Sequence, residues 1–328
     1  MGKGVGIGVS SIVLVLLTSC AGHGRPAPEP FTAWVVNAGA GTVTPFSTVT
    51  GTASKAITVG GEPRAIAISP DGKTAYVANA GSDTVTPIDT ATRTAGQPIP
   101  VGKYPDYVAI TPDGRTAYVA NADSDTVTPI DTATNRAGTP VRVGDSPVAI
   151  AITPDGSTAY VVCDTDPGTV VPISIATNTT GKPVQVGAYP VDVAVTPDGR
   201  TLFVANSLSG TVTPIDTAAD QAETPIRVGG ALTAIAITPD GKTAYAVSSP
   251  RNETGTVIPI LIAPRTPMKP IKAGTDPEAI AITPDGTTIY ILNSLPGTVT
   301  PIQGAAGSPG TPVKVGNFPI AIAYTRGA

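Results

Sequence analysis

The sequence predicts an all-β fold made of repeated units, and three observations carry that prediction. The first is a Pro-Asp-Gly turn that occurs six times, at spacings of 42, 42, 43, 42 and 45 residues. The second is a short aromatic and aliphatic motif that occurs seven times, and the third is the lack of any stretch with sustained helical periodicity. A fixed period of this size is typical of propellers, solenoids and other arrays. The six turns begin at Pro70, Pro112, Pro154, Pro197, Pro239 and Pro284.

Each repeat carries its markers in a fixed order. The aromatic motif, Tyr-Val-Ala-Asn or a near copy, begins at Trp34, Tyr76, Tyr118, Tyr160, Phe203, Tyr245 and Tyr290. A Thr-Val-x-Pro-Ile motif follows it at Thr42, Thr84, Thr126, Thr169, Thr211, Thr256 and Thr298. A glycine then ends each unit, at Gly60, Gly102, Gly144, Gly187, Gly229, Gly274 and Gly316, and an apolar run of the type Pro-x-Ala-Ile-Ala-Ile begins the next.

The two ends of the chain complete one another. The last apolar run, from Pro319, has no aromatic motif after it, whereas the first aromatic motif, at Trp34, has no apolar run before it. We therefore expect the segment from about Pro319 to Thr325 to form the innermost strand of a blade whose other three strands come from residues 32–60. The prediction is a seven-bladed β-propeller of four-stranded blades over residues 32–328, closed by this shared blade. Closure of this kind removes free sheet edges.

Each unit is expected to hold four strands. The apolar run suits a strand buried on both faces, and Pro-Asp-Gly suits a tight turn. The aromatic motif, the Thr-Val-x-Pro-Ile motif and a Pro-Val-Arg-Val-Gly-like segment supply the second, third and fourth strands. The third strand of each unit contains a proline, which cannot donate to a sheet ladder. We expect it to mark a bulge or the point where the outer strand does not pair; it is Pro45, Pro87, Pro129, Pro172, Pro214, Pro259 or Pro301.

The N-terminus has the pattern of a lipoprotein signal. Residues 1–19 hold Lys3 and an apolar run that ends at Leu17, too short for a membrane span of about 20 residues. Leu17-Thr18-Ser19-Cys20 resembles a bacterial lipobox, so Cys20 is the predicted lipidation site, and residues 20–31 form a Pro-rich tether. We expect a lipid anchor on the extracytoplasmic side of a bacterial membrane, inner or outer. The alternative is an ordinary secretory signal with an incidental cysteine.

Composition limits the possible functions. The chain has 24 acidic and 20 basic residues, a net charge of −4 that becomes −5 when Lys3 leaves with the signal, so nucleic-acid binding is not expected. The single histidine, His23, lies in the tether, which excludes a Ser-His-Asp triad or a His-ligated metal in the propeller. Asp89, Asp131 and Asp216 lack the spacing of a calcium loop and are expected in turns. No metal or cofactor is predicted, and Cys163 is expected in the core rather than as a reactive thiol.

The repeated phrases resemble the YVTN β-propeller repeat family, whose signature survives here as Tyr76 to Asn79 and Tyr118 to Asn121. The resemblance covers about residues 32–328. It implies a seven-bladed propeller of the kind found in exported prokaryotic proteins, and it implies no shared catalytic residues. The proline in every third strand departs from the usual pattern of that family.

Function is expected where the repeats differ, because the demands of the fold are common to all copies. The loops before each first strand vary most, and they lie on the same face as the loops between second and third strands. Aromatic and polar groups in a concavity suit a binding site. The alternative is that these loops vary because nothing constrains them. The candidate binding residues are Glu62, Arg64, Tyr104, Asp106, Tyr107, Tyr189, Asp192, Asp276, Glu278 and Phe318.

Two functions of different classes remain. The first is a non-catalytic envelope lipoprotein, expected as a monomeric propeller, that binds a protein, peptide or glycan through this face. The second is a hydrolase or lyase, like the lactonase propellers, that uses carboxylates at Asp106, Asp192 and Glu278. Convergence of these carboxylates on a common point would favour the enzyme, whereas scattered, solvated carboxylates would exclude it. The longer loop from Ser248 to Thr254 is a further candidate for partner contact.

Overall fold

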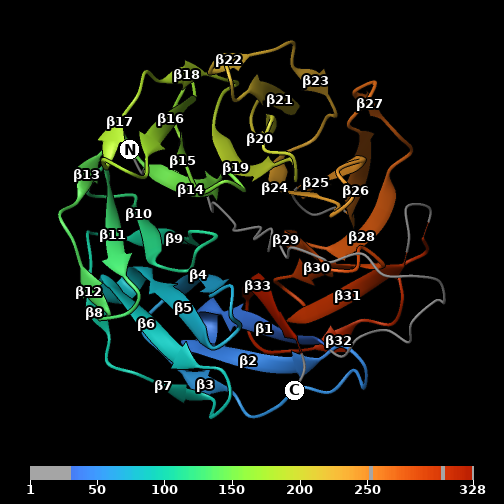
Figure 1. The fold of residues 1–328 in the computed structure, drawn as a ribbon. Helices are drawn as coiled ribbons and strands as arrows, with labels where there is room; N and C mark the ends of the chain where they lie inside the picture. Colours follow the sequence, from blue (N-terminus) through green and yellow to red (C-terminus); the bar gives the residue numbers. More distant parts are fainter. Residues whose placement is uncertain (1–30, 251–253, 304–306, 327–328) are drawn as a thin grey trace, which may run out of the picture.

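The computed structural model describes residues 31–250, 254–303 and 307–326, which form seven antiparallel sheets placed radially around a central axis (Figure 1). The predicted seven-bladed all-β propeller is confirmed. The predicted signal (1–19), lipidated Cys20 and most of the tether lie outside the described residues, as does part of the loop from Ser248 to Thr254. No helix among the described residues is long and apolar enough to cross a membrane.

The blades follow one another along the chain. Blade 1 holds β1 (Phe31–Asn37), β2 (Thr42–Ser47), β3 (Ile57–Thr58) and the C-terminal β33 (Pro319–Arg326). Blade 2 holds β4 (Pro63–Ile68), β5 (Thr74–Asn79), β6 (Thr84–Asp89), β7 (Thr94–Ala95) and β8 (Ile99–Pro100), and blade 3 holds β9 (Pro105–Ile110), β10 (Thr116–Asn121), β11 (Thr126–Asp131), β12 (Arg136–Ala137) and β13 (Val141–Arg142). Two 3-10 turns, η1 (Ala38–Ala40) and η2 (Ala80–Ser82), follow β1 and β5.

The remaining four blades repeat this order. Blade 4 holds β14 (Pro147–Ile152), β15 (Thr158–Cys163), β16 (Thr169–Ser174), β17 (Thr179–Thr180) and β18 (Val184–Gln185). Blade 5 holds β19 (Pro190–Val195), β20 (Thr201–Asn206), β21 (Thr211–Asp216), β22 (Gln221–Ala222) and β23 (Ile226–Arg227). Blade 6 holds β24 (Leu232–Ile237), β25 (Thr243–Ser248), β26 (Thr254–Leu261), β27 (Thr266–Pro267) and β28 (Ile271–Thr275), and blade 7 holds β29 (Pro277–Ile282), β30 (Thr288–Asn293), β31 (Thr298–Gln303) and β32 (Val313–Lys314).

The ring closes through the first and last strands of the chain. β1 pairs antiparallel with β33, from Phe31 opposite Arg326 to Asn37 opposite Pro319. Trp34 strengthens the joint, because its indole Nε1 donates a 3.0 Å hydrogen bond to the Thr325 hydroxyl. The predicted shared blade is therefore confirmed, and its first described strand starts at Phe31.

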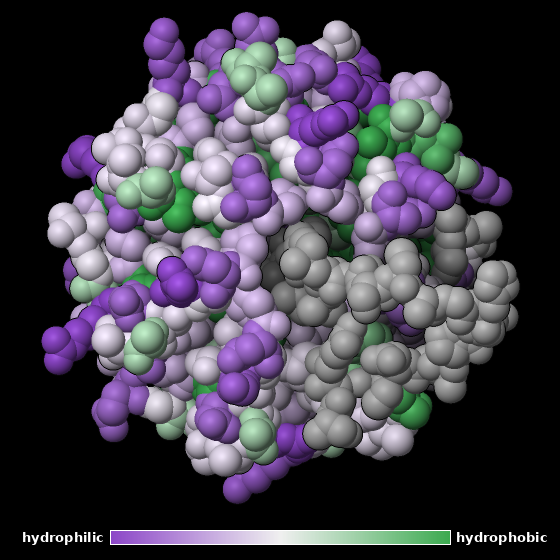
Figure 2. Space-filling view, viewed as in Figure 1, coloured by the Kyte–Doolittle hydropathy of each residue, from purple (hydrophilic) through white to green (hydrophobic). Residues whose placement is uncertain are grey.

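The core lies between neighbouring blades. The inner strands and the aromatic second strands are almost fully buried, and apolar clusters join each blade to the next. On the face turned to the viewer in Figure 2, hydrophilic and neutral residues dominate, and the hydrophobic patches are small and separate. The alternation of Ala with Ile or Val on the inner strands lets adjacent sheets approach closely.

The proline of the third strand faces a gap in the fourth strand. β6 pairs without interruption with β5, so the bulge alternative is wrong. On its outer side, β6 pairs with β8 at Thr84 and Val85 and with β7 at Ile88 and Asp89, and Pro87 lies between the two. The Pro87 carbonyl points toward the outer fourth strand and accepts a 2.7 Å bond from the Gly96 N–H. In an antiparallel strand the N–H and C=O of one residue point to the same side, so the N–H that proline lacks would also face the gap in the fourth strand. The proline therefore removes no hydrogen bond from the sheet. The same carbonyl contact recurs at all seven prolines.

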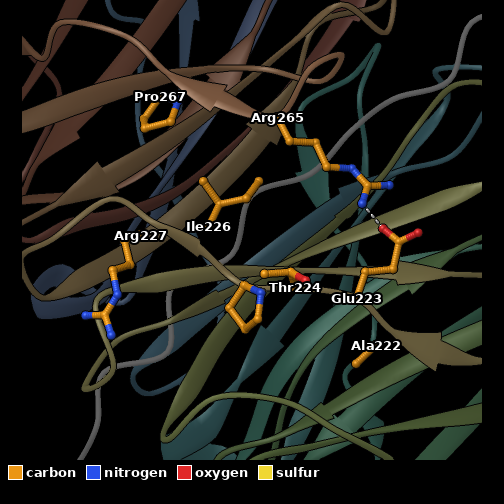
Figure 3. Close-up of a pocket in the computed structure, with 8 residues that line it drawn as sticks. Ala222, Glu223, Thr224, Ile226, Arg227, Arg265 and Pro267 are labelled. Atoms are coloured by element: carbon orange, nitrogen blue, oxygen red, sulfur yellow. Dashed lines mark ion pairs between the residues drawn. The ribbon is translucent and has the colours of Figure 1, made fainter.

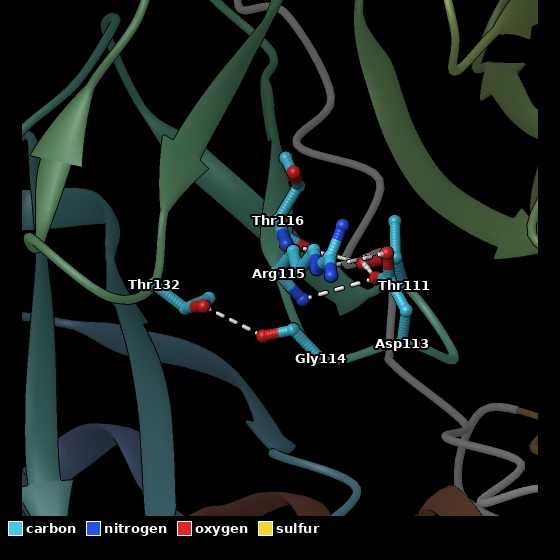
Figure 4. Close-up of polar contacts among 6 residues, drawn as sticks. All are labelled: Thr111, Asp113, Gly114, Arg115, Thr116 and Thr132. Carbon is cyan, nitrogen blue, oxygen red and sulfur yellow. Dashed lines mark hydrogen bonds and ion pairs between the residues drawn. The ribbon is translucent and has the colours of Figure 1, made fainter.

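The Pro-Asp-Gly turns form one face of the ring, which we call the turn face. In the turn shown in Figure 4, the Asp113 carboxylate accepts a 2.6 Å bond from the Thr111 hydroxyl and a 3.0 Å bond from the Arg115 N–H. Thr132, which directly follows β11, donates a 2.6 Å bond to the Gly114 carbonyl and ties the turn to the end of the third strand. The turn role predicted for these aspartates is confirmed. Asp89, Asp131 and Asp216 likewise accept bonds from turn N–H groups two or three residues ahead.

Turns between third and fourth strands link neighbouring blades. The Tyr118 hydroxyl of blade 3 donates a 2.6 Å bond to Asn178 Oδ1 of blade 4, where Asn178 has a φ of 53°. Tyr76 binds Asn135 and Tyr160 binds Asp220 in the same way, at 2.8 Å each. These bonds explain why the aromatic residue of the second strand is so often tyrosine rather than phenylalanine.

Candidate functional site

Every inner strand carries a β-bulge next to its first residue. The register shifts between Pro63 and Ala65 in blade 2, and at the corresponding place in all the other blades. A bulge re-aims the extra side chain and ends the regular pairing, which frees this position from the demands of the sheet. The seven bulge residues are Arg64, Asp106, Val148, Val191, Thr233, Glu278 and Ile320.

The residue two positions before each bulge residue is held in an unusual backbone conformation. Six of these residues are not glycine and yet have φ between 47° and 55°, a region that bulky side chains rarely adopt. In all seven loops the carbonyl of this residue accepts a bond from the N–H that follows a second strand, as Glu62 does from Ala80 at 3.0 Å. These contacts place both sets of loops on one face, which we call the mouth face, as the sequence predicts. The six residues are Glu62, Tyr104, Ser146, Tyr189, Asp276 and Phe318.

Blades 7, 1 and 2 enclose a pocket of about 390 Å³ on the mouth face. Its wall includes the bulge residues of all three blades, Glu278, Ile320 and Arg64. We call it the mouth pocket, and five of the ten candidate binding residues line it. The lining residues are Ala38, Gly39, Glu62, Arg64, Asp276, Glu278, Ser294, Phe318 and Ile320.

Arg64 links the mouth pocket to two further candidates in blade 3. Its Nε lies 3.3 Å from Asp106 Oδ1, and both side chains are almost completely removed from solvent. The guanidinium also donates to the Tyr104 hydroxyl and stands 5.3 Å from the centroid of that ring. A buried cation with a carboxylate and an aromatic partner is held in one place. Arg64 is therefore a fixed charge at the edge of the pocket.

Three carboxyl groups of this region have raised pKa values because burial disfavours their charged forms. Burial raises the pKa of Glu278 to about 8, and the neighbouring Asp276 adds to the rise. Burial raises the pKa of Asp106 to about 7, although Arg64 opposes this rise. Burial also raises the pKa of Asp164 to about 6. At neutral pH, Glu278 is therefore mostly protonated and can act as a proton donor.

Sequence reasoning missed Asp164. This residue follows the second strand of blade 4, at a position that is Ala or Ser in the other six blades. Its Oδ1 is buried, has no hydrogen-bond partner, and its charge raises the pKa of Asp106. A carboxylate at an otherwise small position was the signal that could have revealed it.

The other three candidates do not join the mouth pocket. Asp192 is fully buried, and its carboxylate accepts bonds from the backbone N–H groups of Val193 (2.9 Å) and Ile235 (2.8 Å), which ties blade 5 to blade 6. Tyr107 is buried in a core cluster. Tyr189 stands exposed on its own loop. Of the three carboxylates considered for an enzyme, Asp106 pairs with Arg64, Glu278 lines the same pocket as Arg64, and Asp192 bonds to the backbone.

A second pocket, of about 680 Å³, lies on the outer rim between blades 5 and 6 (Figure 3). Arg265 and Glu223 form an ion pair across it, so the Arg265 guanidinium is already neutralised. The corresponding turn residue in blades 3 and 4 is an asparagine that binds a tyrosine, but blade 5 offers Phe203, which has no hydroxyl. The arrangement serves to join two blades.

No cluster of three or more potential metal ligands occurs in the part of the chain that the structure describes. Cys163 is fully buried, and burial raises the pKa of its thiol to about 12. The thiol is therefore protonated at neutral pH and unreactive, so the core role predicted for Cys163 is confirmed.

Comparison with known families gives one match. The family model described as "Lactonase, 7-bladed beta-propeller" matches residues 29–139 and 130–228, which together span more than half of the chain. No curated protein matches the chain.

Many solved structures share the fold. Kuenenia stuttgartiensis hydrazine synthase is 25% identical, with a TM-score of 0.71 over 81% of this chain and 96% of that one. A functionally unknown protein from Desulfotomaculum acetoxidans is 19% identical, with a TM-score of 0.80 over 90% of this chain and 99% of the other. A protein from Bacteroides uniformis, described as a candidate 6-phosphogluconolactonase, is 18% identical, with a TM-score of 0.76 over 90% of this chain and all of that one. At such identities the last two show the fold alone.

Proposed function

Because this chain belongs to the family of lactonase-type seven-bladed β-propellers, we propose that it is an envelope lipoprotein whose propeller binds a small polar ligand, or the polar end of a larger one, in the mouth pocket. One observation carries the proposal. Arg64, Glu278 and Ile320, the bulge residues of three adjacent blades, meet at one cavity although each comes from a position that the fold leaves free to vary. A larger ligand of this kind would be a protein, a peptide or a glycan.

The path of the chain supports access to the pocket from the aqueous side. Phe31 lies at the turn face, because β1 begins beside Arg326 and ends beside Pro319, next to the mouth. If extended, as their proline content predicts, the ten residues from Ala21 to Pro30 would reach about 30 Å at roughly 3.1 Å per residue. A tether of this length from a lipidated Cys20 would hold the turn face toward the membrane and leave the mouth face open to solution.

The anchor is tested by Cys20→Ala. We expect the wild-type chain to partition with membranes and to incorporate labelled palmitate, and the variant to lose both properties. Unchanged membrane partition in the variant would contradict the lipid anchor. The proposal for the mouth pocket would remain, because it does not depend on Cys20.

The pocket is tested with the protein without its signal, since residues 31–326 hold all seven blades. Peptide and carbohydrate panels are screened by thermal shift, and hits are compared among wild type, Glu278→Gln and Phe318→Ala. Arg227→Ala, on the outer rim, is the control with one altered charge. We expect the two pocket variants to lose binding at least about tenfold and the control to bind as wild type. A ligand that binds equally to all four proteins would show that the pocket is not the site.

A second candidate is hydrolysis or elimination by carboxyl groups, for example at a lactone. The specific observation in its favour is that Glu278 and Asp106 have raised pKa values, about 8 and 7, and that Arg64, which pairs with Asp106, lines the mouth pocket together with Glu278. One protonated and one ionised carboxyl are what general acid-base catalysis requires near neutral pH. We expect a panel of five- and six-membered lactones to be hydrolysed by wild type and about a hundredfold more slowly by Glu278→Gln. Wild-type rates equal to the uncatalysed rates would exclude this candidate.

A further inference from the structure

We propose that the group recognised in the mouth pocket is an ammonium ion on an apolar stem, as carried by a lysine side chain or an amino sugar. This inference rests on the proposed function and specifies its ligand class. Three features carry it: the balance of charge in the pocket, a buried oxygen atom of Glu278 without a partner, and the apolar wall around Phe318.

The charge of the pocket disfavours an anion. Three of its lining residues, Glu62, Asp276 and Glu278, carry carboxyl groups, and a single lining residue, Arg64, carries a positive charge. That guanidinium is already engaged by Asp106 and Tyr104. A phosphate group, with a charge of about −1.5 to −2, would face these carboxylates without an available cation. A cation would instead be attracted by the carboxyl groups of the lining residues.

In its ionised form, Glu278 supplies an acceptor that lacks a donor. The residue is 8% exposed, its Oε2 has no hydrogen-bond partner, and Glu278 is one of the residues that line the pocket. Buried polar atoms nearly always have a partner, so an orphaned oxygen at a cavity indicates what a ligand must bring. An ammonium group brings three N–H donors to this point.

The apolar wall fits the stem of such a ligand. Phe318 is 51% exposed although it lies beside a cavity, and Ile320 and Ala38 continue the apolar surface. A Cβ at Gly39 would lie 3.0 Å from Phe318 Cδ2, so the ring rests against this glycine and is held in position. An aromatic face beside carboxylates is a favourable setting for an organic cation. The cavity volume, about 390 Å³, is that of a small-molecule site.

The direction of the pH dependence separates an ammonium ligand from a neutral, hydroxyl-rich one. The charged groups near Glu278 are Asp276 and Arg64, with Glu62 on the opposite wall. The neighbouring strands β24 and β30 carry no charged residue, and the one on β33, Arg326, is at its far end. An ammonium ion pairs best with ionised Glu278, whose pKa is about 8, so its binding strengthens from pH 6 to pH 9 and releases a proton. A neutral ligand that accepts a hydrogen bond from protonated Glu278 would bind more weakly as the pH rises from 6 to 9.

The experiment is calorimetric titration of the signal-free protein at pH 6, 7.5 and 9. The probes are Nα-acetyl-lysine amide and an amino sugar with its amine on a primary carbon. Their matched neutral controls are the Nε-acetylated lysine derivative and glucose, and glucose 6-phosphate is the anionic control. We expect an ammonium probe to bind at least tenfold more tightly than its neutral control, and more tightly at pH 9 than at pH 6. Preference between the two probes then identifies a peptide or a glycan as the source.

Variants place the effect in the pocket. Glu278→Gln should weaken binding of the ammonium probe at pH 9 about tenfold or more and remove its pH dependence. Asp276→Asn, at a partly exposed loop residue, should weaken it severalfold without risk to folding, and Arg227→Ala should have no effect. Tighter binding of glucose or glucose 6-phosphate, abolished by Glu278→Gln, would overturn the ammonium inference and leave the pocket as the site. If neither the ammonium probes nor any member of the peptide and carbohydrate panels binds, the proposed function fails as well.

Discussion

The amide nitrogen of Asn121 donates a 2.9 Å hydrogen bond to the hydroxyl of Thr128 across the second and third strands of blade 3. The same pair occurs in the four other blades whose second strand ends in asparagine, at 2.8 to 2.9 Å. In the two blades that lack the asparagine, the threonine is also absent: the residue equivalent to Thr128 is Val171 in the blade of Cys163 and Ile258 in the blade of Ser248. The asparagine and the threonine therefore behave as one unit.

We expect this unit to be transferable to blade 4. Cys163→Asn alone buries an amide beside Val171 without its hydroxyl acceptor, and Val171→Thr alone buries an unpaired hydroxyl, at a cost of about 1–3 kcal/mol each. The double variant should be less destabilised than the sum of the two by at least about 1 kcal/mol. Free energies of unfolding in urea measure the cycle. Additive effects would mean that the pairing is incidental.

Gly102 is required by the same asparagine. A Cβ on Gly102 would lie 2.6 Å from Asn121 Cγ, whereas a Cβ on the equivalent Gly144 would lie 3.1 Å from Cys163 Sγ. Gly102→Ala should therefore destabilise the propeller by about 1–3 kcal/mol, through overpacking and loss of the 3.1 Å bond from the Gly102 N–H to Asn121.

Gly144→Ala is the matched control, because its backbone position is the same and its neighbour can yield more easily. Thermal and urea unfolding should show a smaller loss for Gly144→Ala than for Gly102→Ala. Equal losses would indicate that backbone conformation, rather than contact with the asparagine, selects glycine here.

The hydroxyl of Tyr118 joins two blades and should contribute to their association. Tyr118→Phe removes the 2.6 Å bond to Asn178 and should lower the free energy of unfolding by about 1 kcal/mol. In blade 6 the tyrosine is Tyr245, and the corresponding turn position of the next blade is Gly307, which offers no side chain. Tyr245→Phe should therefore cost less than half as much in the same urea experiment. A larger loss for Tyr245→Phe would contradict the role assigned to the turn asparagine.

The sequence predicted what the repeats share and missed what individual blades add. Blade number, closure and the mouth face follow from periodic markers, because each marker meets the same surroundings in every copy. The pairing of Arg64 with Asp106 was not predicted, since only the bulge shows that both side chains leave the sheet at the same point. Asp192 was placed in the binding site, yet its carboxylate bonds to backbone N–H groups that no side-chain pattern reveals. The neutral state of Glu278 depends on burial depth, which the sequence does not encode locally.

The raised pKa values of Glu278 and Asp164 predict how stability changes with pH. A carboxyl whose pKa is higher in the folded chain than its ordinary value favours folding when protonated, so its contribution is complete near pH 4 and is lost as pH rises through the folded pKa. The folded values are about 8 and 6, so the loss extends to about pH 8. Each group contributes at most about 1.4 kcal/mol per pH unit while it titrates. Wild type should therefore lose stability between pH 5 and pH 9.

Glu278→Gln should lose less stability over this range, because the neutral amide has no charge to bury, and Asp164→Asn should show its smaller effect mainly below pH 7.

Asp71→Asn is the control with the opposite sign. The Ser69 hydroxyl and the Lys73 N–H hold the pKa of Asp71 below its usual value, so its stabilising charge is present throughout pH 5 to 9. Asp71→Asn should be less stable than wild type by a constant amount. Urea unfolding at pH 5, 7 and 9 decides the matter: parallel curves for wild type and Glu278→Gln would mean that Glu278 is ionised in the folded protein, and acid-base catalysis by this residue would lose its physical basis.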